Sequence, residues 1–396
     1  MSIGGTKFVT SSADGSATAS SSKIVADLES GLGGEDAALV MFFASTHQPL
    51  GEVASVIANA YPNATVLGAS TAGEFTERGD TKGAVSAFAV AGAFKVYAGI
   101  GVGVRSNPER AVRQALDGLP RSMPGYPHRT GLLLIDTMAG NCEEATLMAA
   151  AELGADFPLA GGAAGDDLKM QSTIVSCGTR AAPDAIVIGQ IFSKEPLGLG
   201  VCHGHRPLSS PLRITKAKAN VVHEIEGRPA WDVWRERTRE AAKAQGIDLD
   251  ALPAAEETGF LLRFEAGLAA GQDYKIRAPL SRTSDGSIQF ACGIPEGAVI
   301  RITESVPRDQ IESAREAARR ARAKLGERSA AGAVVFDCIC RNLILKDHFG
   351  EAVRGMAEEL GNVPVAGFET YGEIALDAGD MSGFHNTTSV VLAFPR

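Results

Sequence analysis

The sequence predicts an α/β protein of two halves, in which mixed sheets are built from repeated strand–helix–strand units. Three segments share one pattern: a continuous apolar run, a stretch with helical period, and a short apolar strand that contains a glycine. The segments start at Ala38, Gly131 and Gly332, and their glycines are Gly68, Gly161 and Gly367. A continuous apolar run indicates a buried strand, and a helical crossover makes the two flanking strands parallel.

The stretches between these segments alternate loosely and predict antiparallel strands, so the sheets are mixed. They cover residues 86–104, 184–201, 286–305 and 385–394. A further helix is predicted before the second segment and before the third, each with a proline near its start (Pro108 and Pro307). Residues 236–258 predict a helix and linker within the second half.

Composition limits the class of protein. The chain has 396 residues, 45% of them hydrophobic and 21% charged, which is typical of a globular protein with two or three domains. A net charge of −9 gives no basic surface for nucleic acid. No apolar run reaches the ~18 residues of a membrane span, and six cysteines do not form a disulfide framework. We therefore expect a cytoplasmic protein that binds neither nucleic acid nor membrane.

The expected domains follow from the repeats and from the first residues. The first 22 residues are rich in Ser, Ala and Gly and lack the apolar core of a secretory signal. They are interpreted as a flexible tail. Residues 23–220 and 221–396 are then the two folded domains.

A glycine–acid pair follows two of the repeated strands at the same distance. Glu74 stands six residues after Gly68, and Glu373 stands six residues after Gly367. The middle copy is one residue shorter and ends in Asp166. The carboxyl ends of parallel strands form the usual ligand crevice of an α/β sheet, so these turns are candidate binding elements. The alternative is that each acid only stabilises its own turn, and both interpretations stay open. In either case Glu74 and Glu373 should occupy equivalent places.

Three of the seven histidines, His203, His205 and His223, lie within 21 positions. Imidazoles so close in sequence could hold a metal or haem iron, although their spacing matches no zinc signature. The alternative is that they are ordinary structural histidines. Known enzyme motifs are mostly absent, so an enzyme that uses the glycine–acid turns and Cys338 is only a second alternative.

Several motifs in order along the chain resemble those of FIST-domain sensory proteins. The resemblance covers nearly the whole chain after about residue 22. The N-terminal FIST motifs are ASTAGEF (69–75), HG (203–204) with RP (206–207), TKAKAN (215–220) and GRPA (227–230). The C-terminal FIST motifs are FDCICR (336–341), PVAGFETYGEIA (364–375) and FHNTT (384–388).

The resemblance implies a non-catalytic intracellular sensor that signals through a partner, a histidine kinase or a cyclic-di-GMP enzyme. Family members are proposed to bind small ligands such as amino acids, and one stand-alone subgroup binds haem to sense nitric oxide. His205 and His223 stand where many members carry other residues. We therefore expect haem b as the cofactor, with His205 as the first-choice iron or metal ligand and His223 as the second. An amino acid or similar metabolite is the alternative ligand.

The resemblance and side-chain chemistry together predict a ligand cleft in the C-terminal half. Its expected lining is Arg341, Tyr371, Glu373 and Asn386, with Glu74 as a further ligand-binding residue. Arginine offers a fork for a carboxylate, glutamate accepts from an ammonium, and tyrosine supplies an amphipathic wall. The alternative is a structural ion pair between Arg341 and Glu373. The chain could also form a homodimer.

Overall fold

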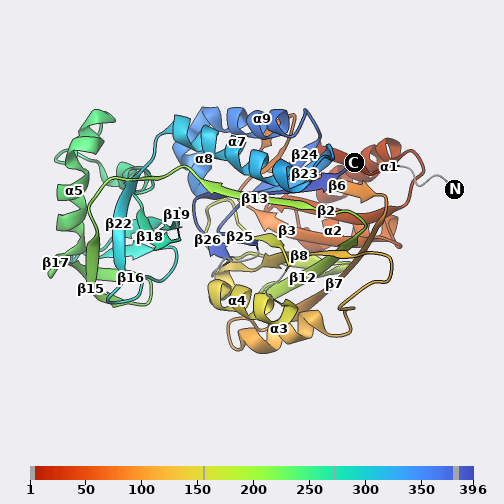
Figure 1. Cartoon of the computed structure of the whole chain (residues 1–396), viewed down its shortest axis with the longest axis horizontal. Coiled ribbons are helices and arrows are strands. Elements are labelled where there is room, and N and C mark those ends of the chain that lie inside the picture. The colour runs from red at the N-terminus through yellow and green to blue at the C-terminus, as the bar shows by residue number, and fades with distance from the viewer. Residues whose placement is uncertain (1–4, 155–156, 272, 378–382) are drawn as a thin grey trace.

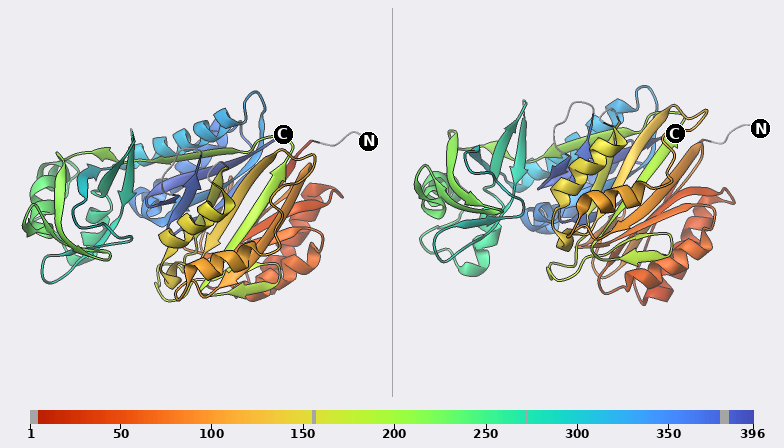
Figure 2. Two further views of the ribbon diagram at one scale, coloured as in Figure 1. Left: turned by 60° about the horizontal axis from the view of Figure 1, so that its bottom comes forward. Right: turned by 90° about the horizontal axis from the view of Figure 1, so that it is seen from below.

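The computed structural model describes residues 5–154, 157–271, 273–377 and 383–396. It consists of a large body of sheets and helices and a smaller body at one end, which holds residues 206–304 (Figure 1). The two further views show the same division (Figure 2). The model confirms an α/β fold with mixed sheets.

The large body is built from three units with one element order: an edge strand, a helix, a strand, a helix, a strand, a two-stranded hairpin and a return strand. Unit 1 contains β1 (Lys7–Ala13), α1 (Ala17–Leu32), β2 (Ala37–Ser45), α2 (Leu50–Ala60), β3 (Thr65–Thr71), β4 (Glu74–Thr76), β5 (Gly79–Thr81) and β6 (Val85–Ala91). Unit 2 contains β7 (Phe94–Val102), α3 (Pro108–Leu116), β8 (His128–Ile135), η1 (Thr137–Ala139), α4 (Cys142–Leu153), β9 (Leu159–Ala163), β10 (Val175–Cys177), β11 (Arg180–Ala182) and β12 (Ala185–Ser193). Unit 3 contains β13 (Gly198–His203), α7 (Pro307–Lys324), β23 (Ala330–Cys338), α8 (Ile339–Leu345), η3 (Lys346–His348), α9 (Phe349–Glu359), β24 (Val365–Thr370), β25 (Glu373–Leu376), β26 (Phe384–His385) and β27 (Thr388–Pro395).

Each of the three sheets of the large body combines four strands of one unit with the hairpin of another. The strand orders are β1-β6-β2-β3-β10-β11, β7-β12-β8-β9-β25-β26 and β13-β27-β23-β24-β4-β5. Unit 1 therefore gives its hairpin to the sheet of unit 3, unit 3 gives its hairpin to unit 2, and unit 2 gives its hairpin to unit 1. In each unit the two central strands are parallel, which confirms the prediction from the repeats.

The inner faces of the three sheets form one shared apolar core, and helix pairs cover the outer faces. Phe43 of unit 1 stacks on Phe368 of unit 3 with ring centroids 4.7 Å apart. The helix pairs are α1 with α2, α3 with α4, and α7 with α9. Each unit thus buries an inner face against the other two units, and this burial is the main stabilising contribution.

Glycines bring two of these helices close to their edge strands. A Cβ on Gly101 of β7 would stand 1.8 Å from the backbone oxygen of Ala111 in α3. A Cβ on Gly200 of β13 would stand 2.0 Å from the oxygen of Ala317 in α7. The two glycines occupy corresponding places in units 2 and 3, and larger side chains there would push the helix away from the sheet.

The smaller body interrupts unit 3 between β13 and α7. It contains β14 (Arg206–Pro207), β15 (Leu212–Lys218), β16 (Val221–Ile225), β17 (Arg228–Pro229), α5 (Ala230–Ala244), η2 (Ala254–Glu256), α6 (Glu257–Leu261), β18 (Ala266–Ala270), β19 (Asp273–Arg277), β20 (Pro279–Arg282), β21 (Ile288–Phe290) and β22 (Val299–Glu304). We call it the inserted body. Its own apolar core includes Trp234 and Phe290. The predicted boundary between residues 220 and 221 separates β15 from β16, which pair with each other, so it divides this body.

The predicted flexible tail is wrong for the residues that the structure describes. Residues 1–4 of it lie outside the described residues, but β1 pairs with β6 along its whole length. Ser16 caps α1 by accepting from the N–H of Ala19 at 3.3 Å. Ser20 and Ser21 are buried in this helix. Their hydroxyls donate to backbone oxygens one turn earlier, so burial leaves neither hydroxyl without a partner. A serine-rich composition therefore concealed a packed helix.

Within the part of the chain that the structure describes, none of the helices combines the length and the apolar character that crossing a membrane requires.

The role of the first strand can be tested at Phe8, which stacks on Phe88 with ring centroids 4.7 Å apart. Phe8→Ala should lower the free energy of unfolding by about 3–5 kcal/mol, because it leaves a cavity in the shared core. Urea denaturation measures this loss, with the exposed Val299→Ala as the control. A loss no larger than that of the control would contradict the packing of β1.

Candidate ligand-binding site

Arg341 is fully enclosed and its donors are occupied. It lies in the first turn of α8 and is 0% exposed. Its Nε donates to Asp337 at 2.9 Å, Nη1 donates to Ser313 at 2.8 Å, and Nη2 donates to the backbone oxygen of Gln310 at 2.8 Å. The structure therefore does not place Arg341 in an open cleft, and its ion-pair partner is Asp337 rather than Glu373.

Glu74 and Glu373 occupy equivalent places, which confirms the prediction from their spacing. Each begins the hairpin that its unit gives to another sheet, and each accepts a hydrogen bond from the threonine three residues earlier, Thr71 or Thr370. Glu373 also accepts from the backbone N–H of Thr388 at 3.1 Å and from its hydroxyl at 2.9 Å. Both carboxyls are completely buried, so they stabilise turns and do not face a cleft.

Burial determines the protonation of these two acids. It raises the pKa of Glu74 to about 8 and that of Glu373 to about 7. Within the described residues, Oε2 of Glu74 has no hydrogen-bond partner. Near neutral pH Glu74 is therefore mainly protonated, and Glu373 is close to its midpoint.

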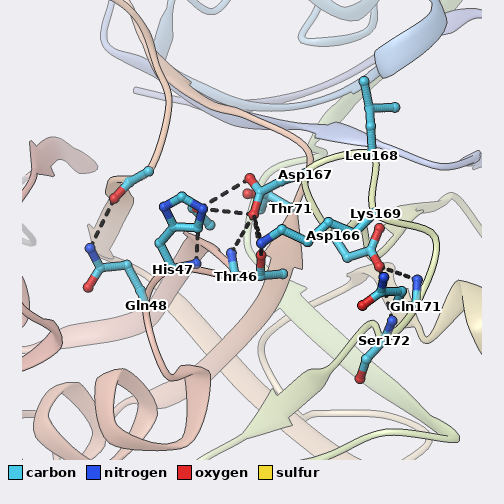
Figure 3. Close-up of polar contacts among 12 residues, drawn as sticks. Thr46, His47, Gln48, Thr71, Asp166, Asp167, Leu168, Lys169, Gln171 and Ser172 are labelled. Atoms are coloured by element: carbon cyan, nitrogen blue, oxygen red, sulfur yellow. Dashed lines mark hydrogen bonds and ion pairs between the residues drawn. The ribbon is translucent and has the colours of Figure 1, made fainter.

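The third turn, in unit 2, is longer and uses two aspartates (Figure 3). Asp166 accepts from the backbone N–H groups of Met170, Gln171 and Ser172 at 2.6–3.0 Å. Asp167 accepts from the N–H of Thr46 at 2.9 Å and so reaches the end of β2 in unit 1. These bonds support left-handed backbone at Asp167 and at Met170. This turn also holds two units together.

Tyr371 and Asn386 lie at the junction of the units with the inserted body. The hydroxyl of Tyr371 donates to Asp166 at 2.7 Å, and its ring lines the cavity described below. Asn386 is buried, and its Oδ1 accepts from the N–H of Ala278 in the inserted body at 3.5 Å. Of the four residues predicted to line one cleft, the structure brings only Tyr371 to an open cavity.

His205 is a buried residue of the linker that leads into the inserted body. Its ring is 0% exposed, Nδ1 contacts the hydroxyl of Thr303 at 3.2 Å, and Nε2 lies 3.7 Å from a carboxyl oxygen of Glu265. Burial lowers the pKa of His205 well below its usual value and raises that of Glu265 well above. The pair is therefore neutral, a buried imidazole beside a protonated carboxyl.

The surroundings of the two candidate histidines do not fit haem. The groove beside His205 has a volume of about 370 Å³ and is lined mainly by polar and charged side chains, whereas a porphyrin ring needs an apolar slot. His223 lies on β16, where its Nδ1 contacts the hydroxyl of Ser287 at 2.8 Å. It is not among the residues that line this groove. Haem b as a cofactor stays a prediction that the geometry of these residues does not favour.

A cavity of about 960 Å³ lies between α4 and the inserted body. In Figure 2, α4 is the helix of unit 2 that lies nearer the inserted body. The lining comes from α4 and the turn before it (Asn141, Cys142, Glu143, Glu144, Leu147, Met148), from the inserted body (Ala219, Asn220, Ala291, Cys292, Gly293), and from unit 3 (Tyr371, Phe384). Carboxylates, carboxamides and aromatic rings thus share one space, which suits a small polar ligand with an apolar part.

An ion cluster joins the two bodies beside this cavity, and Glu143 is the member of the cluster that lines it. Arg277 of β19 donates to Oε1 of Glu143 at 2.7 Å, and Lys275 donates to the same oxygen. Sequence reasoning missed these three residues. No motif marks them, and Glu143 is more than 130 positions from both cations. The glycine–acid turns were easier to find because each is a local pattern.

The comparisons with known proteins place the chain in a family. The family model of the FIST N domain matches residues 38–228, and that of the FIST C domain matches residues 230–376. The chain therefore belongs to the FIST-domain family, whose domains are generally thought to sense small ligands in signalling. The two models meet inside the inserted body, at the start of α5.

Three similar proteins are each named only as an uncharacterized protein. An uncharacterized protein of Methanocaldococcus jannaschii is 25% identical over 162 residues, 40% of this chain and 31% of that protein. Uncharacterized proteins of Mycobacterium bovis and Mycobacterium tuberculosis are each 31% identical over 199 residues, 49% of this chain and of theirs. The chain thus matches about half or less of the length of these relatives.

The structural role of Arg341 can be tested with Arg341→Met. The variant should lose about 3–5 kcal/mol of unfolding free energy, because the buried carboxylate of Asp337 loses its counter-ion. Urea denaturation measures this loss, and Arg354→Met on the exposed face of α9 is the control. A small loss together with impaired ligand binding would instead support the predicted ligand role.

The raised pKa of Glu74 predicts a pH dependence of stability. Between about pH 4.5 and 8 the unfolded chain releases a proton that the folded chain keeps, so this group's contribution to stability falls as pH rises. Glu74→Gln should therefore gain stability relative to the wild type between pH 5 and pH 8.5. The gain should be on the order of 2–4 kcal/mol, since one pKa unit corresponds to ~1.4 kcal/mol. Urea denaturation at both pH values measures it, with surface Glu240→Gln as the control. Equal differences at both pH values would contradict the assignment.

Proposed function

We propose that this protein is a non-catalytic sensor that binds a small metabolite in the cavity between α4 and the inserted body. The observation that carries the proposal is that both bodies line one cavity, while the chain connects them through two linkers, one after β13 and one before α7. A ligand that contacts both bodies favours one relative position over another, and that preference is the signal.

The two linkers are bonded to each other and to the buried core. The hydroxyl of Ser305, on the returning linker, donates to the backbone oxygen of Gly204 on the outgoing one. The Nε2 of Gln310 donates to the hydroxyl of Ser305 at 2.8 Å, and Gln310 also accepts from Arg341. Arg341 therefore anchors the hinge of the inserted body, which supports a role in transmission rather than in ligand contact.

Burial argues against the enzyme alternative. The side chain of Cys338 is 2% exposed, and burial raises the pKa of its thiol well above the usual value. Such a thiol is a poor nucleophile, because the thiolate is the reactive form. The carboxyls of Glu74 and Glu373 are equally inaccessible to a substrate.

Of the two ligands that the resemblance implies, the cavity favours an amino acid or a similar metabolite over haem with nitric oxide. Its lining offers hydrogen-bond donors and acceptors beside the side chains of Leu147, Tyr371 and Phe384. The output would pass to a partner protein, a histidine kinase or a cyclic-di-GMP enzyme, as the family resemblance suggests.

Blocking the cavity tests the proposal. The wild type is titrated by calorimetry with each of the twenty proteinogenic amino acids, and Ala291→Trp is titrated with those that bind. Ala291 is exposed and lines the cavity, so the indole should fill ligand space without breaking the fold and should weaken binding at least tenfold. Val299→Trp, an exposed site outside the lining, is the control.

Two results would contradict this proposal. Unchanged affinity in Ala291→Trp would place the ligand elsewhere. A Soret band in protein produced with ample haem, lost in His205→Ala, would instead support haem as the ligand and His205 as its iron ligand.

A further inference from the structure

We infer that the cavity selects ligands with a carboxylate group, and that this carboxylate replaces the side chain of Glu143 on Lys275 and Arg277. The inference rests on the proposed function, because it assigns the ligand class of the same cavity. It also assigns Glu143 a role: in the absence of ligand, its carboxylate would occupy the place that the ligand carboxylate takes.

The two cations lie on the same face of one strand. Lys275 and Arg277 are two positions apart on β19, so both side chains point to the same side of the sheet. Their side chains are only 13% and 4% exposed, whereas that of Glu143 is 32% exposed and lines the cavity. The two cations are not among the residues that line the cavity, so a ligand carboxylate would reach them only by taking the place of the Glu143 side chain.

Arg277 keeps an unused donor in this cluster. Two cations share a single oxygen of one carboxylate, Oε1 of Glu143. Within the described residues, Nε of Arg277 has no hydrogen-bond partner although the side chain is almost fully buried. A guanidinium can bind a carboxylate through two parallel N–H groups, so Arg277 still has donors for a second acceptor.

The electrostatics favour exchange of one carboxylate for another. Burial acts to raise the pKa of Glu143, but Arg277 and Lys275 outweigh it and hold the pKa below its usual value. Glu143 is therefore ionised, and a ligand carboxylate would bring the same charge. Glu143 also lies in the first turn of α4, whose N-cap Asn141 makes no side-chain cap, so the positive helix end supports an anion there.

The exchange would couple binding to movement. Glu143 belongs to α4 in the large body, and both cations belong to the inserted body. Its bonds to Lys275 and Arg277 hold the two bodies together at this point. A ligand carboxylate that takes those cations releases α4 from β19, while the rest of the ligand contacts the lining of the cavity.

Matched ligands and one matched pair of variants test the inference. Each amino acid that binds is compared with its amide, for example L-leucine with L-leucinamide, by calorimetry on the wild type, Glu143→Gln and Arg277→Gln. In the wild type the acid should bind and the amide should not. Glu143→Gln should bind the acid about tenfold tighter or more, because the competing carboxylate is gone. Arg277→Gln should weaken it at least tenfold.

Glu152→Gln is the control, because Glu152 is on the same helix but pairs with Arg113 on the surface. Its affinity for the acid should stay within about twofold of the wild type. If Arg277→Gln fails to fold, the inference is tested by the affinity of Glu143→Gln for the acid, compared with that of the wild type.

The possible failures can be told apart. Acid and amide that bind equally, or a Glu143→Gln variant with unchanged or weaker affinity, overturn the inference and leave the proposed site intact. A ligand whose affinity Ala291→Trp does not change overturns the proposed site itself. If neither the wild type nor Glu143→Gln binds any of the twenty amino acids, the inference is also wrong.

Discussion

The exchange of two-stranded hairpins between the units is the constraint on which the rest of the structure depends. Every large-body sheet is completed by strands from another unit, so the shared apolar core closes only when all three units are present. The acids at the hairpin starts follow from this requirement. In units 1 and 3 the chain must leave one sheet, turn sharply and enter the next, and a buried carboxyl that accepts from the threonine three residues earlier holds that turn. The sequence offers these polar residues as a candidate ligand site. In the structure they hold the turns that connect one sheet to the next.

The second consequence is that unit 3 can carry an insertion without losing its place in the core. The inserted body leaves after β13 and returns at α7, and β13 and α7 still pack together as β7 and α3 do in unit 2. The buried pair of Arg341 and Asp337 anchors the returning linker through Gln310 and Ser305. A ligand-driven shift of the inserted body would therefore reach the centre of unit 3 through a short chain of hydrogen bonds.

The FIST N and FIST C models divide the chain within the inserted body, whereas the structure divides the large body into three units. The cavity is lined by residues from both family models and from two of the units. Its lining combines unit 2 of the N-terminal part, turns of the inserted body on both sides of the model boundary, and the β24–β25 turn of the C-terminal part. A ligand there would contact both family domains at once, which suits a sensor better than a site confined to either one.

The sequence by itself determined the strand–helix–strand repeats, their parallel pairs and the equivalence of Glu74 and Glu373, because burial pattern and turn spacing are local properties of the chain. It did not reveal β1 and α1, since the serines that suggested a tail satisfy their hydroxyls within the helix. Only the tertiary structure decided that Arg341 pairs with Asp337, that His205 is enclosed, and that Glu143 meets Lys275 and Arg277. The last contact joins residues more than 130 positions apart. The physical reason is that burial and charge pairing depend on which surfaces the hairpin exchange and the insertion bring together, and no local pattern records that.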